Sequence, residues 1–339
     1  MRTALTFSAS DVALTRFAVS PMQEVVTSLR ALAHTPVPAL HRRWADQVRP
    51  RLAAAGLDRG PLATMVPPAG HLPDFLNPAP AGPSPALAEE LAAITATGTA
   101  QVRADLDLLA AERGGRLPAL LEPLYRDPPA RLALLAAEIE AYWQVALAPY
   151  WARIRALLEA DVFHRTRQAA EHGTARVLDD LHETVHWDGE SLRLEHRHCA
   201  VDRLNAGGGL LLLPSAFAWP RVLTRVLPPE PPQLAYPARG TATLWEPRPG
   251  SGTDALAAVV GKSRARLLAE LDSPASTTEL ARRTGLSAAA VSQHLTALRT
   301  AGLTSAHRAG HSVFHARTAV ADLLLDPAAP AGAAGPGTA

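Results

Sequence analysis

The segment STTELARRTGLSAAAVSQHLTALRTAGL, residues 276–303, decides the fold of the C-terminal part of this chain. Ser276 is followed three residues later by Glu279, and this capping box predicts the start of a helix. Gly285 is expected to end that helix, because glycine readily accepts the left-handed backbone found at helix C-termini. The segment therefore begins with a short helix that a glycine terminates.

A second helix follows this glycine. Ser287 is a favourable N-cap residue and predicts where the second helix begins. Val291, Leu295 and Leu298 recur on one face of it, and we expect that face to be buried. Two short helices joined through a glycine form a helix-turn-helix. This is the most informative pattern in the chain.

The flanking residues extend the motif on both sides. Upstream, the run SRARLLAEL, residues 263–271, predicts another helix, and downstream, LTSAHRAGHSVFHART, residues 303–318, contains two strand-like runs. The runs meet at residues 308–311, which form a basic hairpin tip. This order is that of a winged helix, with a recognition helix at 288–301 and a wing at 305–315.

The face of the second helix opposite its apolar stripe favours DNA as the partner. Ala289, Ser292 and Thr296 are small or hydrogen-bonding, which lets a helix enter the major groove, and Gln293 can pair bidentately with adenine. Residues 262–317 contain eight basic and three acidic side chains, although the whole chain carries a net charge of only +1. The predicted DNA-contacting residues are Thr277, Thr278, Ser287, Ala288, Ala289, Ser292, Gln293, His294, Thr296, Arg299, Arg308 and His311.

Residues 262–318 resemble the DNA-binding domain of arsenic-repressor-type (ArsR) bacterial regulators, most specifically in the core VSQHL, residues 291–295. The resemblance implies a dimeric regulator whose recognition helix binds operator DNA and whose wing contacts the backbone or the minor groove. The whole chain is also similar to actinobacterial regulators that place such a domain behind a large uncharacterised N-terminal region. Metal-sensing members carry a cysteine pair that this segment lacks, so we expect no metal site and no cofactor.

The rest of the chain predicts an α+β fold that is mainly helical. We expect helices near 11–19 and 21–33, further helices up to residue 183, and a small antiparallel β-sheet over about 184–246. Residues 1–252 would form a dimerisation or effector domain, residues 253–325 the winged helix, and residues 326–339 a disordered tail. No apolar run of membrane-spanning length and no signal peptide are present, and Cys199 is the single cysteine. We therefore expect a cytoplasmic protein without a membrane partner.

A second motif suggests different chemistry. HETVH, residues 182–186, matches the H-E-x-x-H string of zinc peptidases, which requires both histidines one turn apart on a helix. The alternation in residues 184–187 before Asp188 and Gly189 favours a β-hairpin instead, and we interpret the string as coincidental. Two alternatives stay open: a zinc-dependent hydrolase, and a non-catalytic metal site. The residues of that second site would be His182, His186, His196, His198 and Cys199.

The aromatic run AYWQVALAPYW, residues 141–151, leaves a third alternative, a sensor gated by a small apolar effector, although such residues more often serve core or dimer-interface packing. The helix-turn-helix and the family that it resembles together favour a transcription regulator and not an enzyme, and the resemblance implies that it is a homodimer; we expect a repressor rather than an activator. Its two recognition helices would read an inverted repeat whose half-sites lie about 34 Å apart.

Overall fold

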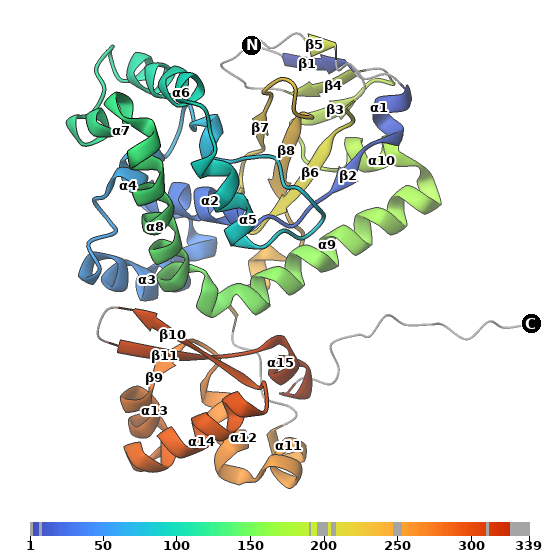
Figure 1. Ribbon diagram of the computed structural model, residues 1–339. Helices are drawn as coiled ribbons and strands as arrows, with labels where there is room; N and C mark the ends of the chain where they lie inside the picture. The colour runs from blue at the N-terminus through green and yellow to red at the C-terminus, as the bar shows by residue number, and fades with distance from the viewer. Residues whose placement is uncertain are drawn as a thin grey trace, which may run out of the picture. The chain divides into compact units, whose positions relative to one another are not determined.

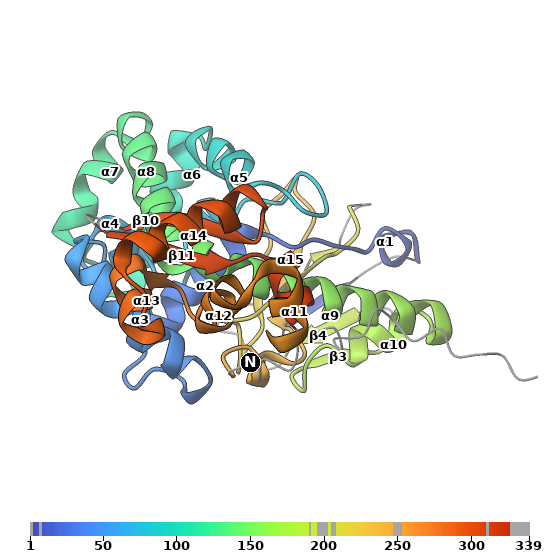
Figure 2. The ribbon, with the colours of Figure 1, turned by 90° about the horizontal axis from the view of Figure 1, so that it is seen from below.

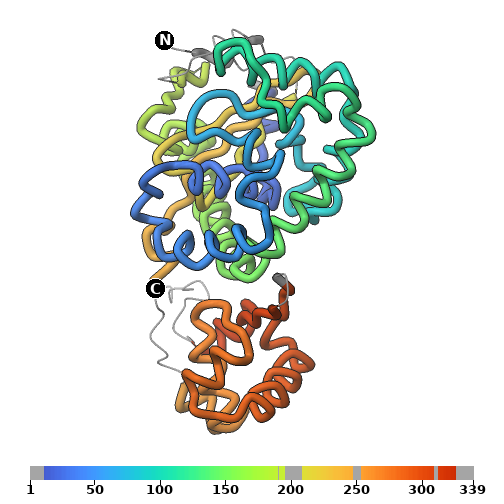
Figure 3. Tube along the Cα trace, turned by 90° about the vertical axis from the view of Figure 1, so that its left-hand side faces the viewer, coloured from blue at the N-terminus to red at the C-terminus, as the bar shows by residue number. Residues whose placement is uncertain are grey.

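The computed structural model describes residues 3–6, 9–189, 191–194, 203–204, 208–246, 253–309 and 312–325. The chain divides into two compact units, traced from blue to red in Figure 3. The larger unit comprises Met1–Trp143 and Ile154–Trp245, and the smaller unit comprises Gln144–Arg153 and Glu246–Ala339. The predicted tail, 326–339, lies outside the described residues. Within the described part of the chain, every helix is too short or too polar to span a bilayer.

Helices dominate the larger unit, as predicted, and strands gather at its two sequence ends. The helices are α1 (Ala9–Ala13), α2 (Pro21–Ala33), α3 (Arg42–Ala54), α4 (Pro61–Met65), α5 (Leu87–Thr95), α6 (Thr99–Glu112), α7 (Glu122–Arg126), α8 (Pro128–Ala146), α9 (Trp151–His172) and α10 (Thr174–Asp179). The strands are β1 (Thr3–Thr6), β2 (Arg16–Phe17), β3 (Val185–Trp187), β4 (Ser191–Leu194), β5 (Arg203–Leu204), β6 (Leu211–Ser215), β7 (Leu223–Arg225) and β8 (Gln233–Pro237). The predicted helix at 21–33 is confirmed, whereas the one at 11–19 is wrong, because α1 ends early and β2 follows it.

The strands form two sheets, and this differs from the single antiparallel sheet expected at 184–246. One sheet has the order β3-β4-β1-β5 and the other the order β2-β6-β8-β7. Antiparallel pairs are present, but β1 pairs parallel with β5, and β2, β6 and β8 are also parallel. The N-terminal strands β1 and β2 thus complete sheets whose other strands come after residue 184. The mainly helical α+β class is confirmed.

Helix α2 lies at the centre of the larger unit, between strand β6 and helix α8. Almost all of its residues are buried, as expected for a helix covered on every side. Its Thr27 hydroxyl lies 3.1 Å from the Ser215 hydroxyl at the end of β6, and its Ser28 hydroxyl lies 2.8 Å from Tyr142 of α8. These contacts join the β2-β6-β8-β7 sheet to the helical region (Figure 1).

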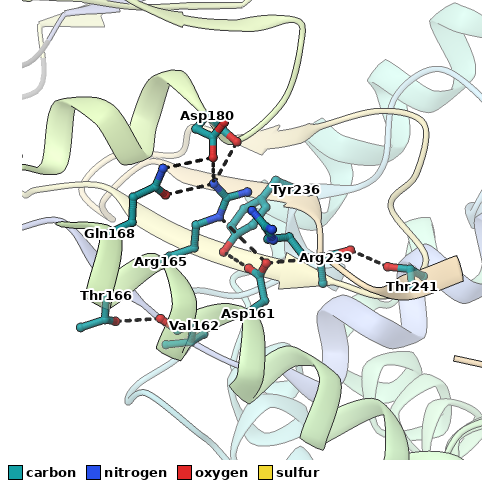
Figure 4. A network of polar contacts seen from close by, with 10 residues as sticks. Asp161, Val162, Arg165, Thr166, Gln168, Asp180, Tyr236, Arg239 and Thr241 are labelled. Carbon is teal, nitrogen blue, oxygen red and sulfur yellow. Dashed lines mark hydrogen bonds and ion pairs between the residues drawn. The ribbon is translucent and has the colours of Figure 1, made fainter. Parts of the chain in front are cut away.

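A buried polar network links helix α9 to strand β8 (Figure 4). The carboxylate of Asp161 accepts hydrogen bonds from the Tyr236 hydroxyl at 2.7 Å and from the Arg239 backbone N–H at 3.1 Å. Arg165, one turn further along α9, donates to the Asp180 carboxylate at 2.8 Å. Because Asp161 and Arg165 are both buried, removing one partner would leave an unsatisfied charge, and the network holds α9 and α10 in place.

Most aromatic side chains of the run at residues 141–151 are packed inside the protein. Tyr142, Trp143 and Tyr150 are all buried, and the Tyr142 hydroxyl forms a hydrogen bond with the Ser28 hydroxyl of α2. This agrees with the core interpretation of these residues.

Candidate nucleic-acid interface

The smaller unit contains the predicted winged helix (Figures 1 and 2). Its helices are α11 (Thr253–Val260), α12 (Lys262–Glu270), α13 (Thr277–Thr284), α14 (Ala288–Thr300) and α15 (Ala319–Leu325). Its strands are β9 (Ala275–Ser276), β10 (Thr304–Ala309) and β11 (Ser312–Arg317), in the sheet order β10-β11-β9. Strands β10 and β11 form the antiparallel wing, from Thr304 opposite Arg317 to Ala309 opposite Ser312. Helices α13 and α14 form the helix-turn-helix.

The caps of α13 and α14 are those expected from the sequence. The Ser276 hydroxyl accepts from the Glu279 N–H at 3.2 Å, and the Glu279 carboxylate accepts from the Ser276 N–H at 2.8 Å, which completes the capping box. Gly285 ends α13 with φ of 71°, in the left-handed region. The Ser287 hydroxyl then accepts from the Ala290 N–H at 3.2 Å and begins α14. Local chemistry therefore fixes both ends of the turn.

One face of α14 is buried, and this sets the rotation of the helix. Val291, Leu295 and Leu298 are each no more than 2% exposed. They belong to one apolar cluster together with Leu256, Ala265, Leu267, Leu268, Leu271, Ala275, Leu280, Leu303, Ala321 and Leu325. Because helical residues advance about 100° each, the opposite face must point away from this core.

That opposite face is exposed and carries no charge along its centre. Ala289, Gln293, Thr296 and Thr300 follow one another at helical spacing and are all exposed, and we call this row the outer stripe. Of the other predicted contacts, Thr278, Ser287, Ala288, Ser292 and Arg299 are exposed, whereas Thr277 and His294 are half-buried. Thr300 was missed in the sequence analysis, although it continues the row by one turn beyond Thr296.

The hydroxyls of the outer stripe have partners within the helix. Thr296 donates to the Ser292 carbonyl and Thr300 donates to the Thr296 carbonyl, each at 3.0 Å. With the hydroxyl hydrogen committed to the helix backbone, each threonine is limited to its methyl group and its oxygen lone pairs for outward contacts.

Basic residues flank the outer stripe instead of lying in it. Arg308 is exposed on β10, while His311, which the sequence predicts at the wing tip, lies outside the described residues. Burial first, and then the nearby positive charge of Arg299, lower the pKa of the His315 imidazole on β11. Arg299 is therefore close to the wing side of α14. Arg317 is occupied within the fold, since it forms an ion pair of 2.9 Å with Asp322.

Further basic side chains that the sequence analysis did not select lie on the preceding helices. The exposed ones are Lys262, Arg264 and Arg266 on α12 and Arg282 and Arg283 on α13. Their clustering on two adjacent helices was visible in the charge count but not in the motif. They add positive charge around the helix-turn-helix, which attracts a polyanion over a range of about 10 Å at moderate salt.

The HETVH string does not form a zinc-peptidase site. Helix α10 ends at Asp179, before His182, and His186 lies on strand β3, so the two histidines do not share a helix. The His182 Nδ1 atom instead accepts the Thr184 N–H at 3.2 Å and lies 2.9 Å from the Thr184 hydroxyl. The hairpin predicted around Asp188 and Gly189 is confirmed by the antiparallel pairing of β3 with β4.

The alternative metal site extends beyond the described residues. Among the residues that the structure describes, no three His, Cys, Asp or Glu side chains come close enough to hold a metal ion. Three of the residues considered for that site, His196, His198 and Cys199, lie outside the described ranges.

Comparisons with known proteins divide the chain in a similar way. Residues 93–242 match a family of unknown function (DUF5937), and residues 262–305 match a helix-turn-helix domain family. Neither the curated proteins nor the solved structures contain a match to this chain. Together with the capped helices and the wing, the second match identifies the C-terminal part of the chain as the winged helix-turn-helix domain of a DNA-binding transcription regulator.

Proposed function

We propose that this protein is a homodimeric transcriptional repressor of the arsenic-repressor type that reads an inverted repeat in operator DNA. The observation that carries the proposal is the surface of α14: a small, uncharged outer stripe opposite a fully buried one. A helix with such a surface can approach base edges closely in the major groove, while basic residues beside it contact phosphates. The sequence predicts that residues 253–325 bind DNA and that residues 1–252 serve dimerisation or effector sensing. The apolar surface described below moves the proposed dimer contact into residues 253–325 and leaves effector sensing to residues 1–252.

Gln293 and Arg308 have different proposed roles in this complex. Gln293, in the outer stripe, would pair with adenine, and Gln293→Ala is expected to relax the base preference at a cost of about 1–3 kcal/mol. Arg308, on the wing, would contact phosphate, and Arg308→Ala is expected to weaken binding to every sequence. Thr277, Thr278, Ser287, Ala288, Ala289, Ser292, His294, Thr296 and Arg299 would supply further contacts from the two helices, and His311 would supply one from the wing tip.

An exposed aliphatic surface supports the proposed homodimer. Helices α11 and α15 pack on each other through the shared core, and their outward residues are almost all apolar. The exposed apolar residues of these two helices are Ala255, Ala258, Val259, Ala319, Val320, Leu323 and Leu324. Val259 is 83% exposed and Leu323 61% exposed, and neither helix carries a basic residue. A second copy of this surface is a complementary partner, because a twofold interface pairs a patch with itself.

The oligomeric state tests this assignment. We expect Leu323→Glu to convert the dimer to a monomer in light scattering and to lower the affinity for a full operator. Leu134→Glu introduces the same charge at an exposed leucine of α8 in the larger unit and should leave the dimer intact. Dimers of unchanged stability in both variants would contradict the α11–α15 interface.

Selection of bound duplexes from a random pool by the full-length chain tests the proposal as a whole. An enriched inverted repeat is the expected result. Failure to retain any duplex at low salt would refute DNA binding. Transcription from a promoter that contains the selected repeat then tests the sign of regulation, and activation would contradict the repressor role. A thermal-shift screen of small apolar molecules tests the proposed effector role of residues 1–252.

A further inference from the structure

The outer stripe of α14 offers few of the groups that recognise guanine. The major-groove edge of guanine presents two acceptors, O6 and N7, and their usual partners are the paired donors of arginine or the ammonium of lysine. Helix α14 contains one such residue, Arg299, in its last turn. Recognition helices contact bases mainly through their N-terminal residues, so Arg299 is at the less favourable end.

The position of Arg299 around the helix points the same way. Residue 299 follows the buried Leu298 directly and therefore lies about 100° from it, on the flank of α14. The charge of Arg299 also acts on His315 of strand β11, which places it near the wing. Arg299 is thus suited to a phosphate contact and not to a base at the centre of the groove.

The exposed side chains of α14 that precede Arg299 present methyl groups, hydroxyls and one amide. Ala288 and Ala289 are exposed methyls, and Thr296, whose hydroxyl donates to the Ser292 carbonyl, adds another. The C5-methyl of thymine is the group in the major groove that favours such apolar contacts. Gln293 supplies the paired donor and acceptor that match adenine N7 and N6. Ser292, a single hydroxyl, can contact several bases and does not discriminate strongly.

We infer that the base pairs read by α14 are A·T pairs, with adenine facing Gln293 and thymine methyls facing Ala289 and Thr296. This inference rests on the proposed function, because it specifies the operator that the same helix would bind. In such a half-site α14 makes no contact with guanine. Most of the affinity then comes from ionic contacts between the phosphates and the basic residues around the helix.

Substituting the amide by a guanidinium tests the inference directly. The full-length chain and its Gln293→Arg variant are each used to select duplexes from the same random pool. We expect an A·T core for the unchanged chain, and a switch from adenine to guanine at one position of each half-site for the variant. In direct binding, exchanging that adenine for guanine should weaken the unchanged chain by about 5- to 150-fold and strengthen the variant.

Arg299→Gln is the matched control, because it alters the same helix by removing its one guanidinium. It should lower affinity for all duplexes alike and leave the selected bases unchanged. A guanine in the core selected by the unchanged chain, or one that disappears in Arg299→Gln, would overturn the inference while leaving DNA binding intact. If no duplex is retained by any of the three proteins, the proposed function itself fails.

Discussion

Replacing Glu24 by glutamine is expected to remove much of the pH dependence of the larger unit's stability. Glu24 lies on α2 and is fully buried. Its two carboxylate oxygens accept from the Ala216 N–H at 3.2 and 3.1 Å. Burial raises the pKa of this carboxyl to about 8, and the hydrogen bonds from Ser215 and Ala216 oppose only part of that rise. The folded chain therefore keeps a proton on Glu24 that the unfolded chain releases.

The direction of the effect follows from this proton. Between the ordinary pKa of 4.5 and the raised value of about 8, the folded state binds more protons than the unfolded state, so its stability falls as the pH rises. Each pKa unit corresponds to about 1.36 kcal/mol. Glu24 should therefore lower the free energy of unfolding by about 3–4 kcal/mol between about pH 5 and about pH 8. Glutamine keeps the shape of the side chain without the titration.

Urea denaturation followed by tryptophan fluorescence measures this difference. Five of the six tryptophans lie in the larger unit and one, Trp151, lies in the smaller unit, so the signal reports mainly the larger unit. We expect Glu24→Gln to equal the unchanged chain near pH 5 and to exceed it in stability near pH 8. Glu183→Gln, which replaces an exposed carboxylate, is the control and should change neither slope. Parallel stability curves for Glu24→Gln and the unchanged chain would refute the reasoning.

The remaining predictions concern single contacts. Gly285→Ala should destabilise the helix-turn-helix by about 1–2 kcal/mol in chemical denaturation followed by circular dichroism, because no atom lies within 4 Å of the new methyl and the left-handed backbone is the whole cost. Leu295→Ala should lower the free energy of unfolding by about 2–5 kcal/mol in the same assay and abolish DNA binding. An affinity for DNA equal to that of the unchanged chain would contradict its place in the core. Tyr236→Phe leaves the Asp161 carboxylate without one donor and should cost about 1–3 kcal/mol by fluorescence-detected unfolding. Arg308→Ala should reduce the slope of log affinity against log salt by about 1, and an unchanged slope would exclude a phosphate contact.

The helix-turn-helix could be predicted from sequence because its signals are local. The capping box of Ser276 and Glu279, the turn at Gly285 and the cap at Ser287 each act within four residues, and all three are formed as expected. The exposed face of α14 was also predictable, since a buried apolar stripe fixes the opposite face of a helix. The half-burial of His294 was not, because it depends on neighbours outside the helix.

The sheets of the larger unit could not be predicted in the same way. Strand β2 is only two residues long, and it pairs with β6, almost two hundred residues later. Its neighbours in sequence resemble a helix, and no local pattern identifies its partner. Strand β1 likewise lies between β4 and β5. Parallel pairing between distant segments is decided by the burial of both faces, as for β6, in which every residue is buried.

HETVH shows how a motif depends on the segment that contains it. A zinc peptidase needs the backbone to stay helical from His182 to His186 so that both imidazoles point the same way. Here the alternation of Val185 and Trp187 buries one side of a strand, and the turn at Gly189 returns the chain as β4. The segment thus forms a hairpin and not a helix, and the spacing of four residues no longer brings the two imidazoles to one face.

Three buried carboxylates of the larger unit also have to be interpreted from the structure that surrounds them. Glu24, Glu90 and Asp105 are all buried, and burial raises their pKa values to about 8, 7 and 6. Raised carboxyl pKa values are often taken as a sign of catalysis. In this protein each of the three accepts a backbone N–H from a distant segment, at Ala216, Met22 and Phe75 respectively. These hydrogen bonds connect segments that are distant in the sequence. The raised pKa values therefore make the stability of the larger unit depend on pH, and they are explained without a substrate.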